Sequence, residues 1–237
     1  AWFLLRKRET AFAKRSILIA GIFGIITSVY LVFTGDGSAR LIAHKQPMKF
    51  AAFEGHYDGQ KGAPLTAFGI ISGIDKDSRY ELPGIKVKLE VPSLLSYLSY
   101  WSQDAYVPGI NDLIIGNPSQ GILSAQEKID RGKEARQILR DLRKAKNENN
   151  TTEYEKLKAK FADQAFLDDY FRYFGYSFLN GPSDLIPNVS LTFNSFRVMV
   201  YLGLFFILLF ILVLIFSFRD TIESKKWLLW LAVFSIP

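Results

Sequence analysis

The sequence predicts an all-α polytopic membrane protein in which transmembrane helices flank a long, mostly helical segment outside the bilayer. Two uncharged apolar runs carry this prediction, the nineteen residues 16–34 and the twenty-one residues 198–218. At a rise of about 1.5 Å per residue, each run spans roughly 30 Å, the thickness of a bilayer's hydrocarbon core. Two such runs exclude a soluble protein, although only 49% of the 237 residues are hydrophobic.

Both ends of the chain are apolar and too short to cross a bilayer. Residues 1–5 form an apolar stub, and residues 227–237 form an apolar tail of eleven residues. A basic cluster follows the stub and no small-residue cleavage site appears, so the opening does not match a signal peptide. We therefore expect both ends to be pieces of further transmembrane helices, and the chain to be a fragment of a larger multi-pass protein.

The charges between the apolar runs predict the orientation of the chain. Residues 6–15 carry a net charge of +4 and residues 219–226 a net charge of +1, whereas residues 35–197 carry 21 basic and 20 acidic side chains. Short basic loops stay in the cytoplasm, and long segments are translocated regardless of their charge. The net charge of +6 is therefore a topology signal, and we expect no nucleic-acid partner.

The chain then divides into six consecutive segments. Those expected in the bilayer or the cytoplasm are 1–15 (the end of a transmembrane helix and a cytoplasmic basic loop), 16–34 (a transmembrane helix), 198–218 (a transmembrane helix), 219–226 (a cytoplasmic loop) and 227–237 (a truncated transmembrane helix). The remaining segment, 35–197, is expected to be extracytoplasmic.

Three local signals are expected to shape the start of the outer segment. Residues 35–38 (Gly-Asp-Gly-Ser) have a turn composition that should end the first membrane helix. A short helix should begin at Pro47, because proline is favoured in the first helical turn. Apolar residues alternate with charged ones over 85–91, which predicts a half-buried strand.

Further along, the sequence predicts a solvated helical hairpin. Ser124 and Glu127 form a capping box at the start of its first helix, 124–146, and a second helix should open near Thr152. Charged side chains of the hairpin, Lys128 among them, are expected to face water. Two interpretations stay open for the aromatic-rich residues 166–178, namely packing within the outer segment or contact with the membrane interface.

Few residues of the chain can bind a metal. There is no cysteine and there are only two histidines, which excludes disulfides, thiolate metal sites and iron–sulfur clusters within this stretch. Met199 lies near the start of the second apolar run, with Arg197 two residues before it. A thioether is a good axial ligand for haem iron, and a guanidinium can pair with haem propionates. The alternative is that Met199 is ordinary apolar filler of a membrane helix.

Lys49 and Glu54 form a second candidate site just after the first membrane helix. With their aromatic neighbours they suit an amphiphilic ligand that enters from the bilayer, such as a quinol. Quinol oxidation needs one group that accepts protons and one that hydrogen-bonds the quinol oxygen. Five residues apart on a regular helix, the two side chains point about 140° from each other. Both reach one ligand only if the helix is interrupted or the ligand lies across its end; the alternative is a charged surface turn.

Several short motifs stand in a fixed order along nearly the whole chain. They are Trp2-Phe3-Leu4-Leu5, Ala11-Phe12-Ala13-Lys14-Arg15-Ser16, Gly35-Asp36-x-Ser38, Gln46-Pro47-x-Lys49-x-Ala51-Ala52-x-Glu54, Val107-Pro108-Gly109, Glu127-Lys128-Ile129-x-Arg131-Gly132 and Ser195-Phe196-Arg197-Val198-Met199-Val200. In order and spacing this set resembles subunit I of the cytochrome bd quinol oxidases, in the form with a long quinol loop.

The resemblance implies roles for the candidate residues. Residues 35–197 would be the extracytoplasmic quinol-binding loop of a multi-pass protein of the bacterial cytoplasmic (inner) membrane. Lys49 and Glu54 match the family's quinol-site Lys and Glu, Met199 matches the Met ligand of the low-spin haem b, and Arg197 matches the Arg associated with that haem. The full-length subunit would also hold a high-spin haem b and a haem d, whose ligands lie outside this stretch, and would pair with oxidase subunit II.

The implied activity is that of a quinol:oxygen oxidoreductase, with the isolated fragment inactive. Quinol would give up its protons at the outer membrane face, and its electrons would reduce oxygen to water through the haems. The alternative from another class is a membrane receptor or sensor whose outer segment, 35–197, binds a ligand.

Overall fold

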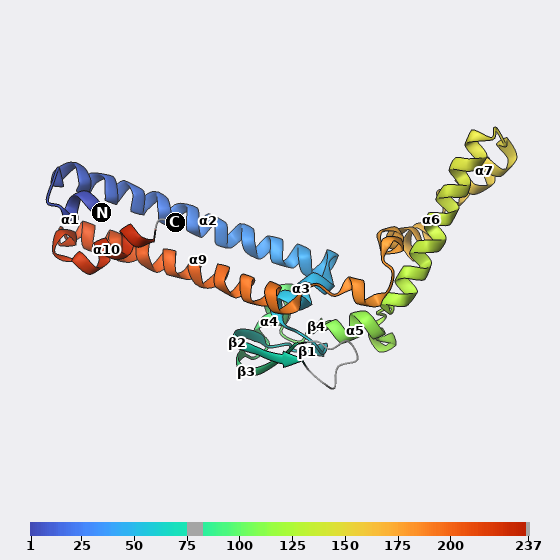
Figure 1. Cartoon of the computed structure of the whole chain (residues 1–237), viewed down its shortest axis with the longest axis horizontal. Coiled ribbons are helices and arrows are strands. Elements are labelled where there is room, and N and C mark those ends of the chain that lie inside the picture. The colour runs from blue at the N-terminus through green and yellow to red at the C-terminus, as the bar shows by residue number, and fades with distance from the viewer. Residues whose placement is uncertain (75–82, 236–237) are drawn as a thin grey trace. The chain divides into compact units, whose positions relative to one another are not determined.

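The structure is a computed structural model that describes residues 1–74 and 83–235 (Figure 1). Its helices are α1 (Trp2–Leu5), α2 (Thr10–Lys45), α3 (Pro47–Glu54), α4 (Leu94–Tyr100), α5 (Ile110–Ile115), α6 (Ala125–Asn147), α7 (Thr151–Lys160), α8 (Gln164–Asp169), α9 (Val189–Phe218) and α10 (Lys226–Phe234). Its strands are β1 (Gln60–Lys61), β2 (Leu65–Ile74), β3 (Pro83–Val91) and β4 (Tyr106–Val107). Short 3₁₀ segments are η1 (Pro118–Gln120), η2 (Phe171–Phe178), η3 (Pro182–Leu185) and η4 (Ile222–Ser224).

The predicted fold class is confirmed. The described chain is mostly helical, and α2 and α9 are each long and apolar enough to cross a membrane. The chain divides into two compact units, one of residues 1–39 with 194–237 and one of residues 40–193.

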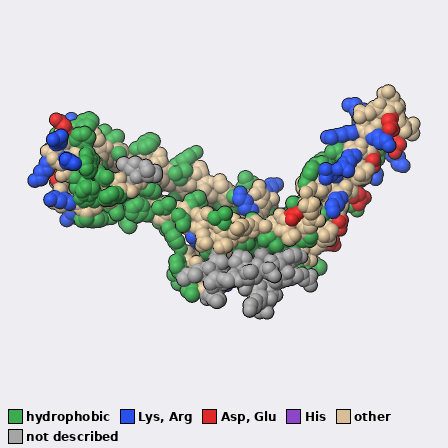
Figure 2. Space-filling view, in the orientation of Figure 1, with side chains coloured by type: hydrophobic (Ala, Val, Ile, Leu, Met, Phe, Trp, Pro, Cys, Tyr) green, Lys and Arg blue, Asp and Glu red, His purple; other side chains and the backbone are tan. Residues whose placement is uncertain are grey.

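In the first unit, two glycines of α2 allow a close approach to α9. A Cβ on Gly21 would lie 3.0 Å from Cδ2 of Leu214, and one on Gly24 would lie 2.7 Å from the ring of Phe210. Small residues have this role between membrane helices, where backbones must come close to gain van der Waals contact. Outside this contact most apolar side chains of the two helices are exposed, as Figure 2 shows.

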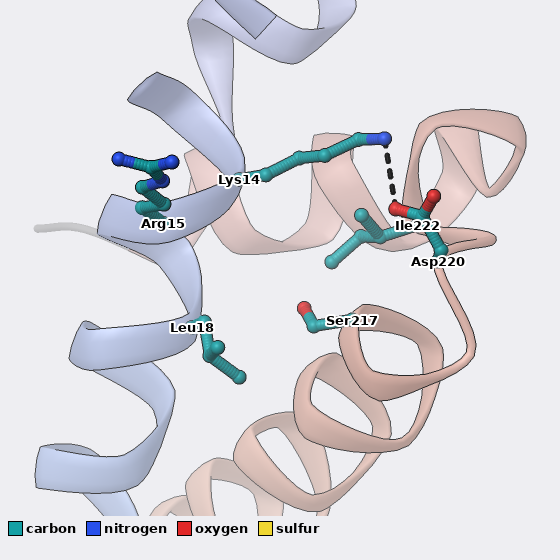
Figure 3. A pocket seen from close by; sticks show the side chains of 6 residues that line it. All are labelled: Lys14, Arg15, Leu18, Ser217, Asp220 and Ile222. Carbon is teal, nitrogen blue, oxygen red and sulfur yellow. Dashed lines mark hydrogen bonds and ion pairs between the residues drawn. The ribbon is translucent and has the colours of Figure 1, made fainter. Parts of the chain in front are cut away.

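The two short basic segments lie at the same end of this unit. Lys14 of α2 forms ion pairs with Asp220 at 2.8 Å and Glu223 at 3.1 Å, beside a small cavity of about 110 Å³ that Ser217 and Arg15 also line (Figure 3). Lys and Arg side chains gather at this end in Figure 2. Residues 6–15 and 219–226 therefore share one side, as the charge pattern requires of two cytoplasmic loops.

The prediction that residues 35–38 end the first membrane helix is wrong, because α2 continues to Lys45. A glycine inside a helix costs only about 1 kcal/mol relative to alanine, and Ser38 Oγ donates a hydrogen bond to Thr34 O at 2.9 Å within the helix. The helix ends at Gln46 (φ −135°), because Pro47 excludes helical geometry from the residue before it. As predicted, α3 begins at Pro47. At the other end of the outer segment α9 begins at Val189, before the apolar run.

In the second unit, the strand predicted over 85–91 is confirmed as β3, which pairs antiparallel with β2. The partner strand β2 was not predicted. Val87 and Leu89 are exposed, so the strand is not half-buried as expected. A second two-stranded pair, β1 with β4, joins Gln60 to Val107 and Lys61 to Tyr106.

The helical hairpin is formed by α6 and α7. Its capping box is confirmed: Glu127 N donates to Ser124 Oγ at 3.2 Å, and Ser124 N donates to Glu127 Oε2 at 2.9 Å. The aromatic-rich residues pack on this hairpin, which confirms the packing interpretation for Phe166, Tyr170 and Phe171. They form a core with these residues of α6, α7 and the following segment: Ala135, Ile138, Leu157, Phe161 and Leu167.

Lys128 does not face water, contrary to expectation. Only 8% of the residue is exposed, because it lies on the buried face of α6 with Ile129 and Gly132. A Cβ on Gly132 would collide with the Tyr173 carbonyl in the segment after the hairpin. Burial lowers the pKa of the Lys128 ammonium, and the positive charge of Arg172 lowers it further. A charge on an amphipathic helix is usually solvated, but packing readily covers a lysine stem of this length.

Candidate functional site

The short helix α3 is held by an apolar cluster. Met48, Ala51 and Ala52 of α3 pack against Ile110, Leu113 and Ile114 of α5, together with Ala125 and Val189. The two alanines are fully buried. Small side chains on this face let α5 lie close to α3, and the position of α3 therefore depends on the position of α5.

Glu54 is the last residue of α3 and is buried, with 5% of its surface exposed. Gly55 ends the helix in the left-handed conformation (φ 65°), which glycine adopts without steric cost. The phenyl rings of Phe50 and Phe53 lie 5.2 Å apart on the same helix, and both residues are buried. The carboxylate thus belongs to a buried residue at the end of a short helix that also carries two buried aromatic rings.

Lys49 is exposed and the helix between it and Glu54 is uninterrupted. The structure therefore does not bring the two side chains onto one helix face. Of the two conditions set by the sequence, an interrupted helix is ruled out and a ligand lying across the end of α3 remains.

His56, two residues after the helix, is buried. Its Nε2 lies 3.2 Å from Val107 O, so this nitrogen carries the hydrogen and donates it. Burial lowers the pKa of His56, because the surroundings disfavour the charged imidazolium. The carbonyl of His56 accepts a hydrogen bond from Ile110 N at 3.0 Å, and that of Tyr57 accepts one from Asn111 N at 2.9 Å. The exit of α3 is therefore bound to the start of α5.

Asp112 is the centre of a hydrogen-bond network that fixes α5. Its Oδ2 accepts from Tyr106 Oη at 2.7 Å and from Gly109 N at 3.1 Å, and its Oδ1 accepts from Asn117 Nδ2 at 3.1 Å. Burial, and then the hydrogen bond to Asp112, raise the pKa of the Tyr106 phenol to about 12. Gly59 is required beside this network, since a Cβ there would collide with Asp112 Oδ2.

Sequence reasoning missed this network, although one signal for it was present. An acidic residue three positions after Gly109, where α5 begins, is the arrangement in which a side chain bonds back to the helix start. The partners Tyr106 and Asn117 carry no such local signal, because they come from a strand and a loop.

Arg197 and Met199 both lie on α9 but face different ways. Arg197 is buried, with 7% of its surface exposed, whereas Met199 is 60% exposed. Two residues of a helix are about 200° apart, so the guanidinium and the thioether are on opposite sides of α9. The Cζ atom of Arg197 lies 5.3 Å from the ring centroid of Phe196. The thioether is as exposed as other apolar side chains of α9, such as Leu204 at 60%, so exposure alone does not separate a ligand from apolar filler.

These features define a helical protein with two membrane-length helices, a buried carboxylate at the end of a short helix, and an exposed thioether on one long helix. The chain belongs to the cytochrome bd terminal oxidase subunit I family, which it matches over residues 1–237. This membership confirms the family assignment made from the motifs.

Curated relatives match the whole chain. Cytochrome bd-II ubiquinol oxidase subunit 1 of Escherichia coli (strain K12) is 27% identical over 242 residues, which cover 100% of this chain and 44% of the relative. Cytochrome bd ubiquinol oxidase subunit 1 of Bacillus subtilis (strain 168) is 28% identical over 240 residues, with 100% and 37% coverage. The chain thus spans less than half the length of these relatives. A solved bd oxidase structure from Geobacillus thermodenitrificans aligns with 92% of this chain and 52% of its own, at 19% identity and a TM-score of 0.41.

Proposed function

We propose that this chain is part of the large subunit of a quinol:oxygen oxidoreductase in a bacterial cytoplasmic membrane, and that residues 35–197 lie outside the cytoplasm and bind quinol. Family membership supports the oxidase over a receptor or sensor. The observation that carries the quinol site is the burial of Glu54 at the end of α3, directly after a membrane-length helix. A buried carboxylate next to a membrane-length helix suits the transfer of a proton from a quinol hydroxyl.

In this proposal the quinol lies across the C-terminal end of α3. Its ring contacts apolar surface near Phe53, and Glu54 accepts the proton of one hydroxyl. Lys49, exposed on another face of the same helix, would hydrogen-bond the second quinol oxygen from the opposite side of the ligand. Oxidation of one quinol releases two protons, which leave on the outer side, and two electrons.

The thioether of Met199 would bind the iron of the low-spin haem b on the exposed face of α9, and that haem supplies the electron acceptor. Arg197 is proposed as the residue that would pair with the propionates of this haem. The high-spin haem b, the haem d and subunit II would belong to the rest of the oxidase.

The quinol site is tested in the full oxidase with two variants. Glu54→Gln keeps the shape of the side chain but cannot take the proton, so turnover with quinol should fall at least tenfold, about 1.4 kcal/mol in the barrier. Lys49→Ala should raise the Michaelis constant for quinol more than it lowers turnover, the mark of lost binding. Lys133→Ala, on an exposed position of α6, is the matched control and should change neither.

An artificial electron donor that bypasses the quinol site separates this role from a folding defect. Loss with quinol but not with the artificial donor supports the site. Equal loss with both donors would mean that the variants damage folding or haem insertion, and the assignment of Lys49 and Glu54 would fall.

The haem ligand is tested by Met199→Leu, which keeps the side-chain volume but removes the sulfur. We expect the low-spin haem b signal to be lost or converted to high spin while the other haem signals remain. An unchanged reduced-minus-oxidised spectrum would refute the ligand, and a full-length protein without haem absorbance would favour the receptor. For the topology, a reporter fused near Asn149 should be extracytoplasmic and one near Glu223 cytoplasmic.

A further inference from the structure

We propose that one face of α4 docks onto the lipid headgroup region of the bilayer, beside the point where α2 leaves the membrane. This aromatic face consists of Tyr97, Leu98 and Trp101, which are 40%, 41% and 64% exposed. The inference rests on the proposed membrane crossing of α2, but on no part of the quinol chemistry.

The helix α4 has two distinct faces. At about 100° per residue, Tyr97, Leu98 and Trp101 fall within an arc of about 100° on one side. Leu95 and Ser99 lie on the other side and are each only 2% exposed. An amphipathic helix normally exposes polar residues, yet the exposed side of α4 carries two aromatic rings and a leucine.

The buried face holds α4 firmly in place. Ser96 Oγ accepts a hydrogen bond from Ala63 N at 2.7 Å and donates one to Ala105 O at 2.8 Å. Leu95 N also donates to Ala63 O, at 3.2 Å. Because these bonds fix the helix from behind, the aromatic face cannot turn inward to bury itself.

Trp101 stands in an unfavourable backbone conformation. Its φ is 56°, in the left-handed region, which costs a residue with a Cβ about 1–2 kcal/mol. The conformation ends α4 through a hydrogen bond from Trp101 N to Tyr97 O at 2.9 Å, and the two rings meet edge to face at 5.5 Å. A glycine would satisfy this backbone without strain, so the large ring is the feature that needs a reason.

The occupant of this face follows from its contacts with α2. The Arg40 guanidinium carbon lies 4.2 Å from the Trp101 ring centroid, and the His44 and Tyr100 rings meet at 4.9 Å. Arg40 comes six residues after the apolar run 16–34, so at most about 9 Å of helix separates it from the end of that run. Side chains on a helix lean toward its N-terminus, here toward the apolar run.

These lengths place the aromatic face at headgroup depth. The polar region of one leaflet is about 5–7 Å thick, which matches the reach of Arg40 back toward the apolar run. Tyrosine and tryptophan are enriched at this depth. A protein partner would need no such position along α2, and the chemistry of the face therefore favours lipid.

The test measures which molecules reach the Trp101 indole in the full oxidase in phosphatidylcholine–phosphatidylglycerol liposomes. The fluorescence of wild type minus that of Trp101→Phe isolates the signal of Trp101. We expect lipids brominated near the carbonyl end of their chains to quench this signal at least twofold more than lipids brominated at the chain ends or than aqueous iodide. An unchanged thermal midpoint and circular dichroism spectrum of Trp101→Phe show that the variant is folded.

A matched control comes from Phe178, which is 61% exposed and lies 4.3 Å from the guanidinium carbon of Arg136. Phe178→Trp in the Trp101→Phe background should be quenched by iodide and not by brominated lipid. Iodide quenching of Trp101 without lipid quenching, or no quenching by either, would overturn the proposal, the second because protein would cover the face. Equal lipid quenching of Trp101 and of the control would overturn it too. Lipid quenching in a protein that fails the quinol assays would leave it standing.

Discussion

Removal of the Asp112 carboxylate should loosen α5, the helix against which α3 and its candidate quinol site pack. Asp112→Ala deletes three hydrogen bonds, those from Tyr106 Oη, Gly109 N and Asn117 Nδ2. A hydrogen bond to a charged acceptor contributes about 1.5–3 kcal/mol, and the half-buried position of Asp112 calls for the lower end of the range or less. At about 1 kcal/mol for each bond, the free energy of locally opening α5 should fall by about 3 kcal/mol.

The conservative variant separates charge from shape. In Asp112→Asn the remaining oxygen can still accept from Tyr106 and Gly109, but the new amide faces the amide of Asn117, and two donors then meet. Asn117 cannot simply rotate its amide, because Ser119 Oγ donates to its Oδ1 at 2.7 Å. We therefore expect Asp112→Asn to cost about 1–2 kcal/mol, between wild type and alanine.

Hydrogen exchange in the full oxidase measures this opening directly. The reporters are the amides of Ile110 and Asn111, which donate to the carbonyls of His56 and Tyr57 at the exit of α3. A loss of about 3 kcal/mol corresponds to roughly a hundredfold faster exchange in Asp112→Ala, and the Michaelis constant for quinol should rise with it. Exchange of both amides within threefold of wild type would refute the view that Asp112 holds α5 against α3.

Three further predictions concern stability of the outer segment. Lys128→Met should raise the free energy of unfolding by roughly 1 kcal/mol, seen as a higher thermal midpoint, because it removes a buried charge whose pKa burial lowers. The exposed Lys133→Met should not raise it. The pKa of His56 is below its usual 6.5 in the folded chain, so as the pH falls below 6.5 the unfolded chain takes up the proton first and the free energy of unfolding decreases. His56→Gln should reduce this decrease, measured as the urea midpoint between about pH 7.5 and 5. Gly132→Ala should cost about 1–3 kcal/mol and speed proteolysis of η2, because its Cβ meets the Tyr173 carbonyl, whereas Gly175→Ala, with no atom within 4 Å, should not.

The elements that the sequence predicted well are those with strong local patterns. The two apolar runs, the capping box of Ser124 and Glu127, and the alternation over 85–91 each contain their signal within a few residues. The proline at 47 likewise marks a helix start on its own. Such features were found because their causes act between neighbours in the chain.

The failures share a different cause, since packing between distant segments decided them. A segment more than forty residues away packs on the face of α6 that carries Lys128, since a Cβ on Gly132 would collide with the Tyr173 carbonyl. Asp112 gains meaning only through Tyr106 and Asn117, which no periodicity links to it. Residues 35–38 have turn composition, but continuing α2 through them costs less free energy than breaking the hydrogen bonds of the helix.

The same distinction applies to the two candidate sites, each of which the sequence predicts from a pair of residues close together in the chain. Helical geometry separates the residues of both pairs, Lys49 from Glu54 and Arg197 from Met199. For the first pair, the proposed function depends on the end of α3. Glu54 is the last helical residue, and it is buried. In the proposed function the quinol lies across this helix end, with Glu54 on one side of it and Lys49 on the other.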